Sequence, residues 1–359
     1  MSWIGLRDEF GGVFSPAGLE RPNFAQADLQ TIMPRGTLMM EFASDPRGGR
    51  QMLLNFGSSH PWASGLTLTL DNHGVLRLTR WQGNERRDFD LLTDVVTVKA
   101  SVTVTYTWDA PARRGVLALE VGDSAPAFME LVAPLPMSLN DVQRMMTDTH
   151  HCSVNSGASF VAIADEIMPI GVLPTLGADT MVDTPTGPFA VSALRAGQMV
   201  VTALGDVAQV RWCGSALLPA RGRFAPLTLR APYHGLRQDM IVSGNQRLQA
   251  SGTEVEYLFG TDTVAMRAGH LSEGENTREA ACGLTYRYWQ VLLDCAAPMR
   301  VAGLVFEGLD VTSLRADPSL RKHSVLSTLP PELMPRLASD LVPLLHDYET
   351  MTLRHFLSA

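Results

Sequence analysis

The stretch TMVDTPTGPFAVSALRAGQMVVT (residues 180–202) opens the part of the chain that decides the fold. Proline and glycine recur in it at short intervals, which predicts short β segments rather than a helix. The overlapping stretch ALRAGQMVVTALGDVAQVRWCG (193–214) reads as a strand, a turn at Gly205-Asp206 and another strand. Residues 263–271 and 284–294 are two further expected strands, and no long helix is predicted before about residue 330.

The chain before this region also has a β pattern. Residues 66–80, LTLTLDNHGVLRLTR, form two alternating runs around the turn Asp71–Gly74, a typical hairpin pattern. Three later stretches are expected strands, and MSLNDVQRMM, which begins at Met137, is an expected short helix. The expected strands are residues 95–107, 115–122 and 159–167. Many strands with few helices and regular turns predict a β-sandwich over roughly residues 1–170.

The tail has a different periodicity. In PPELMPRLASDLVPLLHDYETMTLRHFL (330–357), apolar residues recur at helical spacing, and the two prolines suit a helix start. The apolar residues are Leu337, Leu341, Leu344, Leu345, Tyr348 and Leu353. A helical arm packed on the β body is expected, and a helix that binds a partner is the alternative.

Composition and charge exclude several classes of protein. The formal net charge is −8 and no segment concentrates lysine and arginine, so nucleic-acid binding is not expected. The short basic run at Arg77, Arg80, Arg86 and Arg87 has acidic neighbours and is interpreted as a solvated strand face. The four cysteines lack a CxxC pair, so neither a zinc site nor a disulfide framework is expected, and we expect no metal and no cofactor.

Targeting features are sparse. No run of about 18 apolar residues is free of charge, so no membrane association is expected. The first residues, MSWIGLRDEFGG, lack a basic region followed by an apolar one. We therefore expect a cytoplasmic protein, or one exported by a route without an N-terminal signal peptide. The oligomeric state does not follow from the sequence.

Several stretches of residues 174–310 together resemble the bacterial Hint (hedgehog/intein) domain family. They occur in the family's order and at family-like spacing: 180–202, QVRWCGSALLPARGRFAPLTLRA (209–231), QDMIVSGNQRL (238–248), VAMRAGHL (264–271), TYRYWQVLLD (285–294) and VFEGLDVTSL (305–314). The resemblance implies an all-β Hint fold. The expected protein is thus mainly β, with a sandwich at 1–170, a Hint domain at 171–313 and a helical C-terminal tail at 314–359.

The resemblance also implies a self-processing chemistry. In Hint proteins a residue at the start of the first strand, usually cysteine, attacks the preceding carbonyl and converts the peptide into an ester or thioester. A histidine in a later loop polarises the scissile peptide and protonates the leaving amine. A thiol suits the first role because it ionises near pH 8.5, and imidazole suits the second because its pKa lies near neutral pH.

The expected catalytic positions depart from this pattern. Thr175 stands where the nucleophilic cysteine is expected, and a threonine hydroxyl needs an adjacent base. Gln246 replaces the loop histidine in Ser243–Arg247, and Gln290 replaces a histidine of the last signature, in which Asp294 is kept. Glutamine can donate a hydrogen bond but cannot carry a proton. The four positions are therefore interpreted as a mostly degenerate active site.

Four other residues are candidates to replace the missing groups. His270 matches a family histidine that is interpreted as structural, and His234 is a weaker candidate for a base. Cys213 lies too far along the chain from the first strand. Cys295 is the one thiol near the last strand, although a small core residue is the simpler interpretation.

Residues 1–170 resemble concanavalin- and laminin-G-like jelly rolls, which implies sugar binding. No Glu-x-Asp-x-x-Glu triplet is present, so glycoside hydrolysis is not expected. Trp62, Trp81 and Trp108 are interpreted as core residues, with a sugar platform as the alternative. Asp71, Asn72 and His73 are interpreted as turn residues rather than calcium ligands.

Three functions are compatible with these sequence features. The first is a catalytically silent Hint fold that acts as a structural or interaction module and binds a protein partner. The second is autocatalytic cleavage before Thr175, and the third is carbohydrate binding by the N-terminal sandwich.

Overall fold

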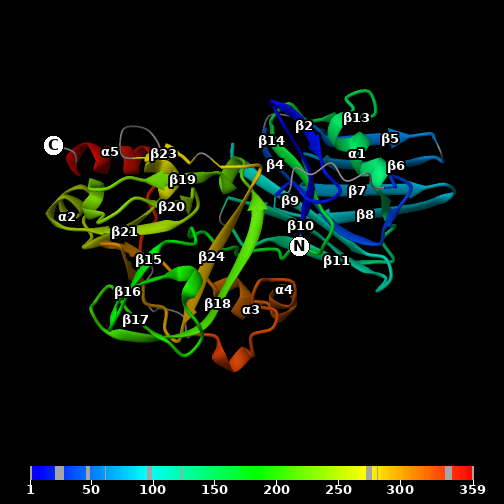
Figure 1. Ribbon diagram of the computed structural model, residues 1–359. Helices are drawn as coiled ribbons and strands as arrows, with labels where there is room; N and C mark the ends of the chain where they lie inside the picture. The colour runs from blue at the N-terminus through cyan, green and yellow to red at the C-terminus, as the bar shows by residue number, and fades with distance from the viewer. Residues whose placement is uncertain are drawn as a thin grey trace. The chain divides into compact units, whose positions relative to one another are not determined.

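Antiparallel strands make up most of the regular structure in the computed structural model, and two compact units, Met1–Gly171 and Val172–Ala359, divide the chain (Figure 1). The structure describes residues 2–20, 28–45, 49–60, 62–94, 99–122, 124–271, 277–280, 282–335 and 342–357. None of the helices in these ranges is both long and apolar enough to cross a bilayer. The expected mainly β fold is confirmed.

The first unit contains a seven-stranded and a five-stranded sheet. The larger has the order β11 (Ala127–Val132), β10 (Arg114–Val121), β9 (Ser101–Asp109), β4 (Arg35–Ala43), β14 (Ala158–Ala164), β1 (Trp3–Asp8) and β2 (Gly11–Phe14). The smaller has the order β13 (Cys152–Val154), β5 (Gln51–Ser58), β6 (Ser64–Leu70), β7 (Val75–Gln82) and β8 (Glu85–Leu92). Strands β3 (Ile32–Met33) and β12 (Met137–Ser138) form a short pair.

One hydrophobic core joins the two sheets of this unit. Leu66 and Leu78 from the smaller sheet and Val104 and Tyr106 from the larger one are fully buried in it. The predicted helix is present as α1 (Leu139–Thr147), capped by Ser138, whose hydroxyl accepts a hydrogen bond from the Asp141 amide. This arrangement is the expected β-sandwich.

Most strands expected in this unit are found. The 66–80 hairpin is β6 and β7, and Asp71 Oδ1 accepts hydrogen bonds from the amides of His73 and Val75 in its turn. Residues 95–98 lie outside the described residues, so only the later part of the 95–107 prediction is tested, by β9. One interpretation is wrong: Arg80 is 1% exposed and points into the core, because it alternates with the exposed Arg77 along β7.

The second unit has three sheets. The first has the order β16 (Gly187–Ala190), β15 (Met181–Thr184), β25 (Met299–Val301), β26 (Leu304–Phe306), β21 (Arg247–Ser251) and β22 (Thr263–Arg267). The second is β17 (Met199–Val201), β18 (Val207–Pro219) and β24 (Thr285–Leu293), and the third is β20 (Met240–Ser243), β19 (Pro226–Leu229) and β23 (Thr277–Glu279). The long pair of β18 and β24 is visible in Figure 1.

Short helices follow or interrupt these strands. They are α2 (Thr253–Phe259), α3 (Thr312–Ala316), α4 (Pro318–Lys322) and α5 (Asp347–Leu357). The sequence patterns did not predict α2, which has only seven residues.

The expected long helix from residue 330 is wrong in extent. Pro331–Leu333 form one 3₁₀ turn, and the helix proper begins at Asp347. Pro343 lacks an amide hydrogen and would break a helix that ran through it, and Leu344 instead bridges to Ala265. Leu337 and Leu341 lie outside the described residues. Leu345 and Leu353 are buried in the core of the second unit, which confirms that the arm packs on the β body.

Candidate functional site

The segment that holds Thr175 lies between β20 and β24. The Thr175 carbonyl accepts a hydrogen bond from the Ser243 amide at 2.8 Å. Leu176 exchanges two backbone hydrogen bonds with Trp289, at 3.0 and 2.7 Å, and is fully buried. The backbone of the segment is thus held by strands that come from two later parts of the chain, and the Thr175 side chain is positioned between them.

The Thr175 hydroxyl is held by two glutamines. It donates to Gln246 Oε1 at 2.5 Å and accepts from Gln290 Nε2 at 3.1 Å. Gln246 is 2% exposed and Gln290 is 3% exposed. Three of the four positions expected from the family resemblance therefore meet in one hydrogen-bonded cluster, which we call the Thr175 cluster (Thr175, Gln246 and Gln290).

Further bonds fix both amides in one orientation. Gln246 Nε2 donates to the carbonyls of Arg247, at 2.7 Å, and Glu307, at 3.1 Å. Gln290 Oε1 accepts from the Val291 amide at 3.2 Å. The oxygen and the nitrogen of each amide form hydrogen bonds, so a flip of either amide group would lose hydrogen bonds. The Glu307 carbonyl was missed by sequence reasoning, because a backbone acceptor has no residue signature.

The Thr175 cluster contains no group that can move a proton at neutral pH. In the described ranges, both hydrogen-bond partners of Thr175 Oγ1 are neutral amides, and neither is titratable. An acyl shift needs the hydroxyl proton to reach the departing amine, and a general base normally carries it. The two amides orient the hydroxyl, and neither of them can serve as that base.

Asp294 lies outside this cluster. Its Oδ1 accepts from the Gln209 amide at 3.0 Å, and its own amide donates to the Gln209 carbonyl at 2.9 Å. These bonds join the end of β24 to β18. In this structure the retained carboxylate therefore supports the strand pair.

The structure also shows where the other candidate cysteines and histidines lie. Cys213 Sγ lies 3.6 Å from the Val191 carbonyl, and burial raises the pKa of this thiol. Cys295 is exposed, and His270 lies in the 3₁₀ turn Ala268–Leu271. His234 lies in the turn Tyr233–Gly235, and its side chain is outside the described residues. Among the described residues, no three His, Cys, Asp or Glu side chains could hold a metal ion.

The three tryptophans singled out in the first unit differ in environment. Trp108 is fully buried, and its Nε1 donates to the Met33 carbonyl at 3.2 Å, so it is a core residue as expected. Trp81 is half-buried, and Trp62 is 46% exposed. The core interpretation therefore fails for Trp62.

A family model described as the Hint domain matches residues 174–312. Those residues are a Hint domain. The match includes all three members of the Thr175 cluster, and it begins one residue before Thr175. It covers neither the sandwich nor the residues that follow position 312. A search of curated proteins found no match.

Solved structures similar to each unit were also found. The gp41-1 intein is 12% identical, with 38% of this chain and 99% of that one covered and a TM-score of 0.25. The bacterial intein-like domain from Clostridium thermocellum is 15% identical, with 38% and 99% covered and a TM-score of 0.26. The Ruminococcus gnavus IT-sialidase CBM40, solved with alpha2,6 sialyllactose, is 13% identical, with 46% and 88% covered and a TM-score of 0.27. At TM-scores below 0.5, nothing about the function of this chain follows from them.

Proposed function

We propose that the Hint domain of this chain does not process itself and acts as a structural or interaction module. The observation that carries the proposal is the Thr175 hydroxyl, which donates to one buried amide and accepts from another. Both amides are anchored and neither can take a proton. General acid–base help is worth about 10²–10⁴-fold in rate, so its loss makes the first acyl shift very slow.

The domain then serves as a rigid support for the segments around it. The residues that follow the last strand pack on its core through Leu345 and Leu353, and Leu344 bridges to Ala265 in β22. Helix α5 contains Leu353 and also Tyr348, which is 67% exposed. A module of this kind presents loops and a helix to a protein partner and needs no chemistry of its own.

The intact mass of the purified protein tests the proposal. We expect a single species near 39.1 kDa, unchanged after a day with a thiol or hydroxylamine. Two fragments that meet at Pro174–Thr175, and that disappear in Thr175→Ala, would overturn the proposal and identify a threonine nucleophile.

A variant that carries the cysteine and histidines usual in the family tests why the domain does not process itself. In Thr175→Cys combined with Gln246→His and Gln290→His, a thiol and two imidazoles take the place of the neutral cluster. We expect thiol-dependent fragments from this variant and none from Thr175→Cys alone. If the triple variant stays intact while its circular dichroism spectrum is unchanged, the loss of activity lies elsewhere in the domain.

A further inference from the structure

A buried ion pair in the first unit joins the five-stranded sheet to helix α1. Arg80 of β7 is 1% exposed and Asp141 of α1 is 3% exposed, and Arg80 Nη2 lies 3.5 Å from Asp141 Oδ2. Arg80 Nη1 donates to the carbonyls of Gly65 and Trp81, each at 2.7 Å. Arg80 Nη2 donates to the Pro136 carbonyl at 3.0 Å. Both terminal nitrogens of the guanidinium therefore have backbone partners.

Three buried polar atoms of this unit have no hydrogen-bond partner among the described residues. They are Arg80 Nε, Asp141 Oδ2 and the hydroxyl oxygen of Tyr106, a residue of β9 that is fully buried. Asp141 Oδ1, in contrast, accepts from the Ser64 hydroxyl at 2.9 Å. Buried donors and acceptors are nearly always paired with a protein group or an ordered water, because an unpaired one is costly. The two atoms of the ion pair and the phenol thus call for a further partner.

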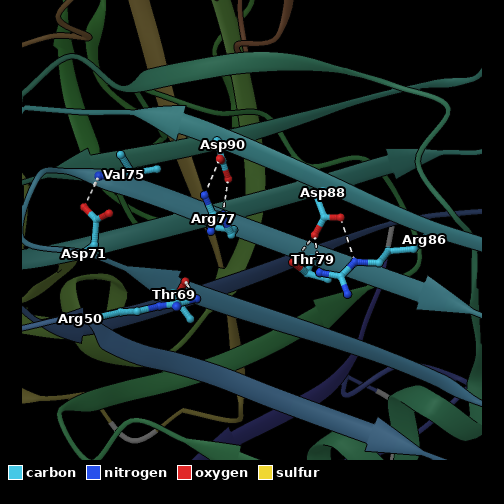
Figure 2. Close-up of polar contacts among 9 residues, drawn as sticks. All are labelled: Arg50, Thr69, Asp71, Val75, Arg77, Thr79, Arg86, Asp88 and Asp90. Carbon is cyan, nitrogen blue, oxygen red and sulfur yellow. Dashed lines mark hydrogen bonds and ion pairs between the residues drawn. The ribbon is translucent and has the colours of Figure 1, made fainter.

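The charged side chains on the opposite face of the same sheet show direct pairing (Figure 2). Arg77 donates to Asp90 through Nε and Nη2, each at 2.7 Å. Arg86 donates to Asp88 through the same two nitrogens, at 2.8 and 3.0 Å. In both pairs a carboxylate satisfies Nε, whereas Nε of Arg80 has no partner. The 3.5 Å between Arg80 and its carboxylate also exceeds the usual length of a charge-assisted hydrogen bond.

Tyr106 brings the seven-stranded sheet to the same region. Arg80 donates to the carbonyl that directly precedes β12, and β12 pairs with β3. Met33 of β3 accepts from Trp108 Nε1 at 3.2 Å, and the ring centroids of Trp108 and Tyr106 are 5.4 Å apart. Burial raises the pKa of Tyr106, and the positive charge of Arg80 opposes that rise, so the phenol lies within the field of the guanidinium.

The chemistry of the three atoms selects the kind of ligand. Arg80 Nε can only donate, an ionised Asp141 can only accept, and the Tyr106 hydroxyl can do either. The charges of Arg80 and Asp141 cancel, so neither a cation nor an anion is favoured between them. Water both donates and accepts, and a buried water typically forms about three hydrogen bonds. A single water molecule therefore matches the set.

We propose that one ordered water molecule is bound between Arg80 Nε, Asp141 Oδ2 and the Tyr106 hydroxyl. The water accepts from Arg80, donates to Asp141 and exchanges a hydrogen bond with the phenol. It thereby links β7 of one sheet, β9 of the other and helix α1 inside a core that is otherwise held by apolar contacts. This site belongs to the first unit and does not depend on the function proposed for the Hint domain.

A high-resolution crystal structure of the full chain tests the proposal directly. We expect a water peak at about 2.7–3.2 Å from both Arg80 Nε and Asp141 Oδ2. A direct hydrogen bond between these two atoms, with no water peak beside them, would overturn the proposal.

Oxygen-17 relaxation dispersion counts the water molecules that stay bound in solution. We expect Arg80→Met combined with Asp141→Leu to have one long-lived water fewer than the unaltered chain. Arg77→Met combined with Asp90→Leu removes the exposed ion pair of the same sheet and is the matched control, with an unchanged number. The proposal fails if the folded Arg80–Asp141 double variant has as many long-lived waters as the unaltered chain.

Tyr106→Phe keeps the ring and removes one of the three partners. We expect the residence time of the water to shorten by about tenfold, as the loss of one hydrogen bond predicts. Circular dichroism of each variant separates loss of the water from loss of fold. If the Arg80–Asp141 double variant does not fold, Tyr106→Phe and the crystal structure decide the result. An unchanged residence time in folded Tyr106→Phe would contradict the site as proposed.

Discussion

The Thr175 hydroxyl has one hydrogen bond to donate, and Gln246 Oε1 accepts that hydrogen bond. That bond points the hydroxyl proton at a neutral amide oxygen, and Gln290 Nε2 donates to one of the two lone pairs of the hydroxyl oxygen. At the scale of single residues, the hydrogen bonds of the Thr175 cluster should stabilise the fold, because they satisfy polar groups that are buried.

Replacement of Gln246 by leucine should therefore cost stability. The variant keeps the volume but leaves Thr175 Oγ1 and the Glu307 carbonyl without this partner, at a cost of about 1–3 kcal/mol. Urea unfolding measures the difference. Gln238→Leu, at an exposed position where the glutamine side chain forms no hydrogen bond within the described residues, should change the free energy of unfolding by less than about 0.5 kcal/mol. Equal costs for the two variants would mean that the cluster contributes no stability.

The cysteines should differ in reactivity in the order of their burial. Burial disfavours the thiolate and raises the pKa of Cys152 to about 11, whereas Cys295 is exposed. Below pH 11 the Cys152 thiol stays protonated, so at pH 8 its alkylation by iodoacetamide should be slower than that of Cys295 by roughly a hundredfold. Site-resolved mass spectrometry measures both rates. Similar rates at pH 8 would show that Cys152 is accessible to solvent.

At the scale of elements, helix α1 is tied to the sandwich by polar contacts as well as by its apolar face. Val142 and Met145 pack into the core, and Asp141 pairs with Arg80 inside it. Removal of one member leaves the other charge buried, which is more costly than the loss of the pair as a whole. An exposed ion pair in the same sheet, Arg77–Asp90, provides the comparison.

Asp141→Ala should destabilise the protein by about 3–5 kcal/mol, because the buried Arg80 loses its counter-charge. Asp90→Ala, in which each partner is 47% exposed, should cost less than about 1 kcal/mol. Chemical unfolding of both variants gives the two values. If Arg80→Met combined with Asp141→Leu is as unstable as Asp141→Ala, then an unpaired charge is not the cause.

At the scale of the whole molecule, two hydrophobic cores stabilise the chain. Leu68 is fully buried in the core of the first unit and Leu194 in that of the second. The three domains predicted from the sequence, at 1–170, 171–313 and 314–359, remain a prediction. Independent cores predict that each unit has its own unfolding transition.

Cavity-forming substitutions test this independence. Leu68→Ala and Leu194→Ala should each remove about 2–5 kcal/mol from one unit, because each leaves a void where a side chain was buried. In differential scanning calorimetry, each variant should lower one transition and leave the other unchanged. A shift of both transitions by either variant would mean that the two units unfold as one.

The sequence alone determined the features that depend on local pattern. Alternation along residues 66–80 predicted a hairpin, because side chains of a strand alternate between core and solvent. The order of short motifs identified the Hint domain, because each motif covers one to a few consecutive strands and turns that are close in sequence. Periodicity misled at residues 331–335 and 342–346, where one 3₁₀ turn and an extended segment with Pro343 stand in place of the expected helix.

Only the tertiary structure decided how distant residues combine. Thr175 is 71 residues from Gln246 and 115 from Gln290, and no local pattern says which of them donates to the other. The same holds for Trp81, whose ring lies on Gly65, and for Arg80, whose buried guanidinium pairs with Asp141, 61 residues later in the chain. Hydrogen-bond direction and burial depend on which surfaces meet, and that is settled only when the sheets are packed.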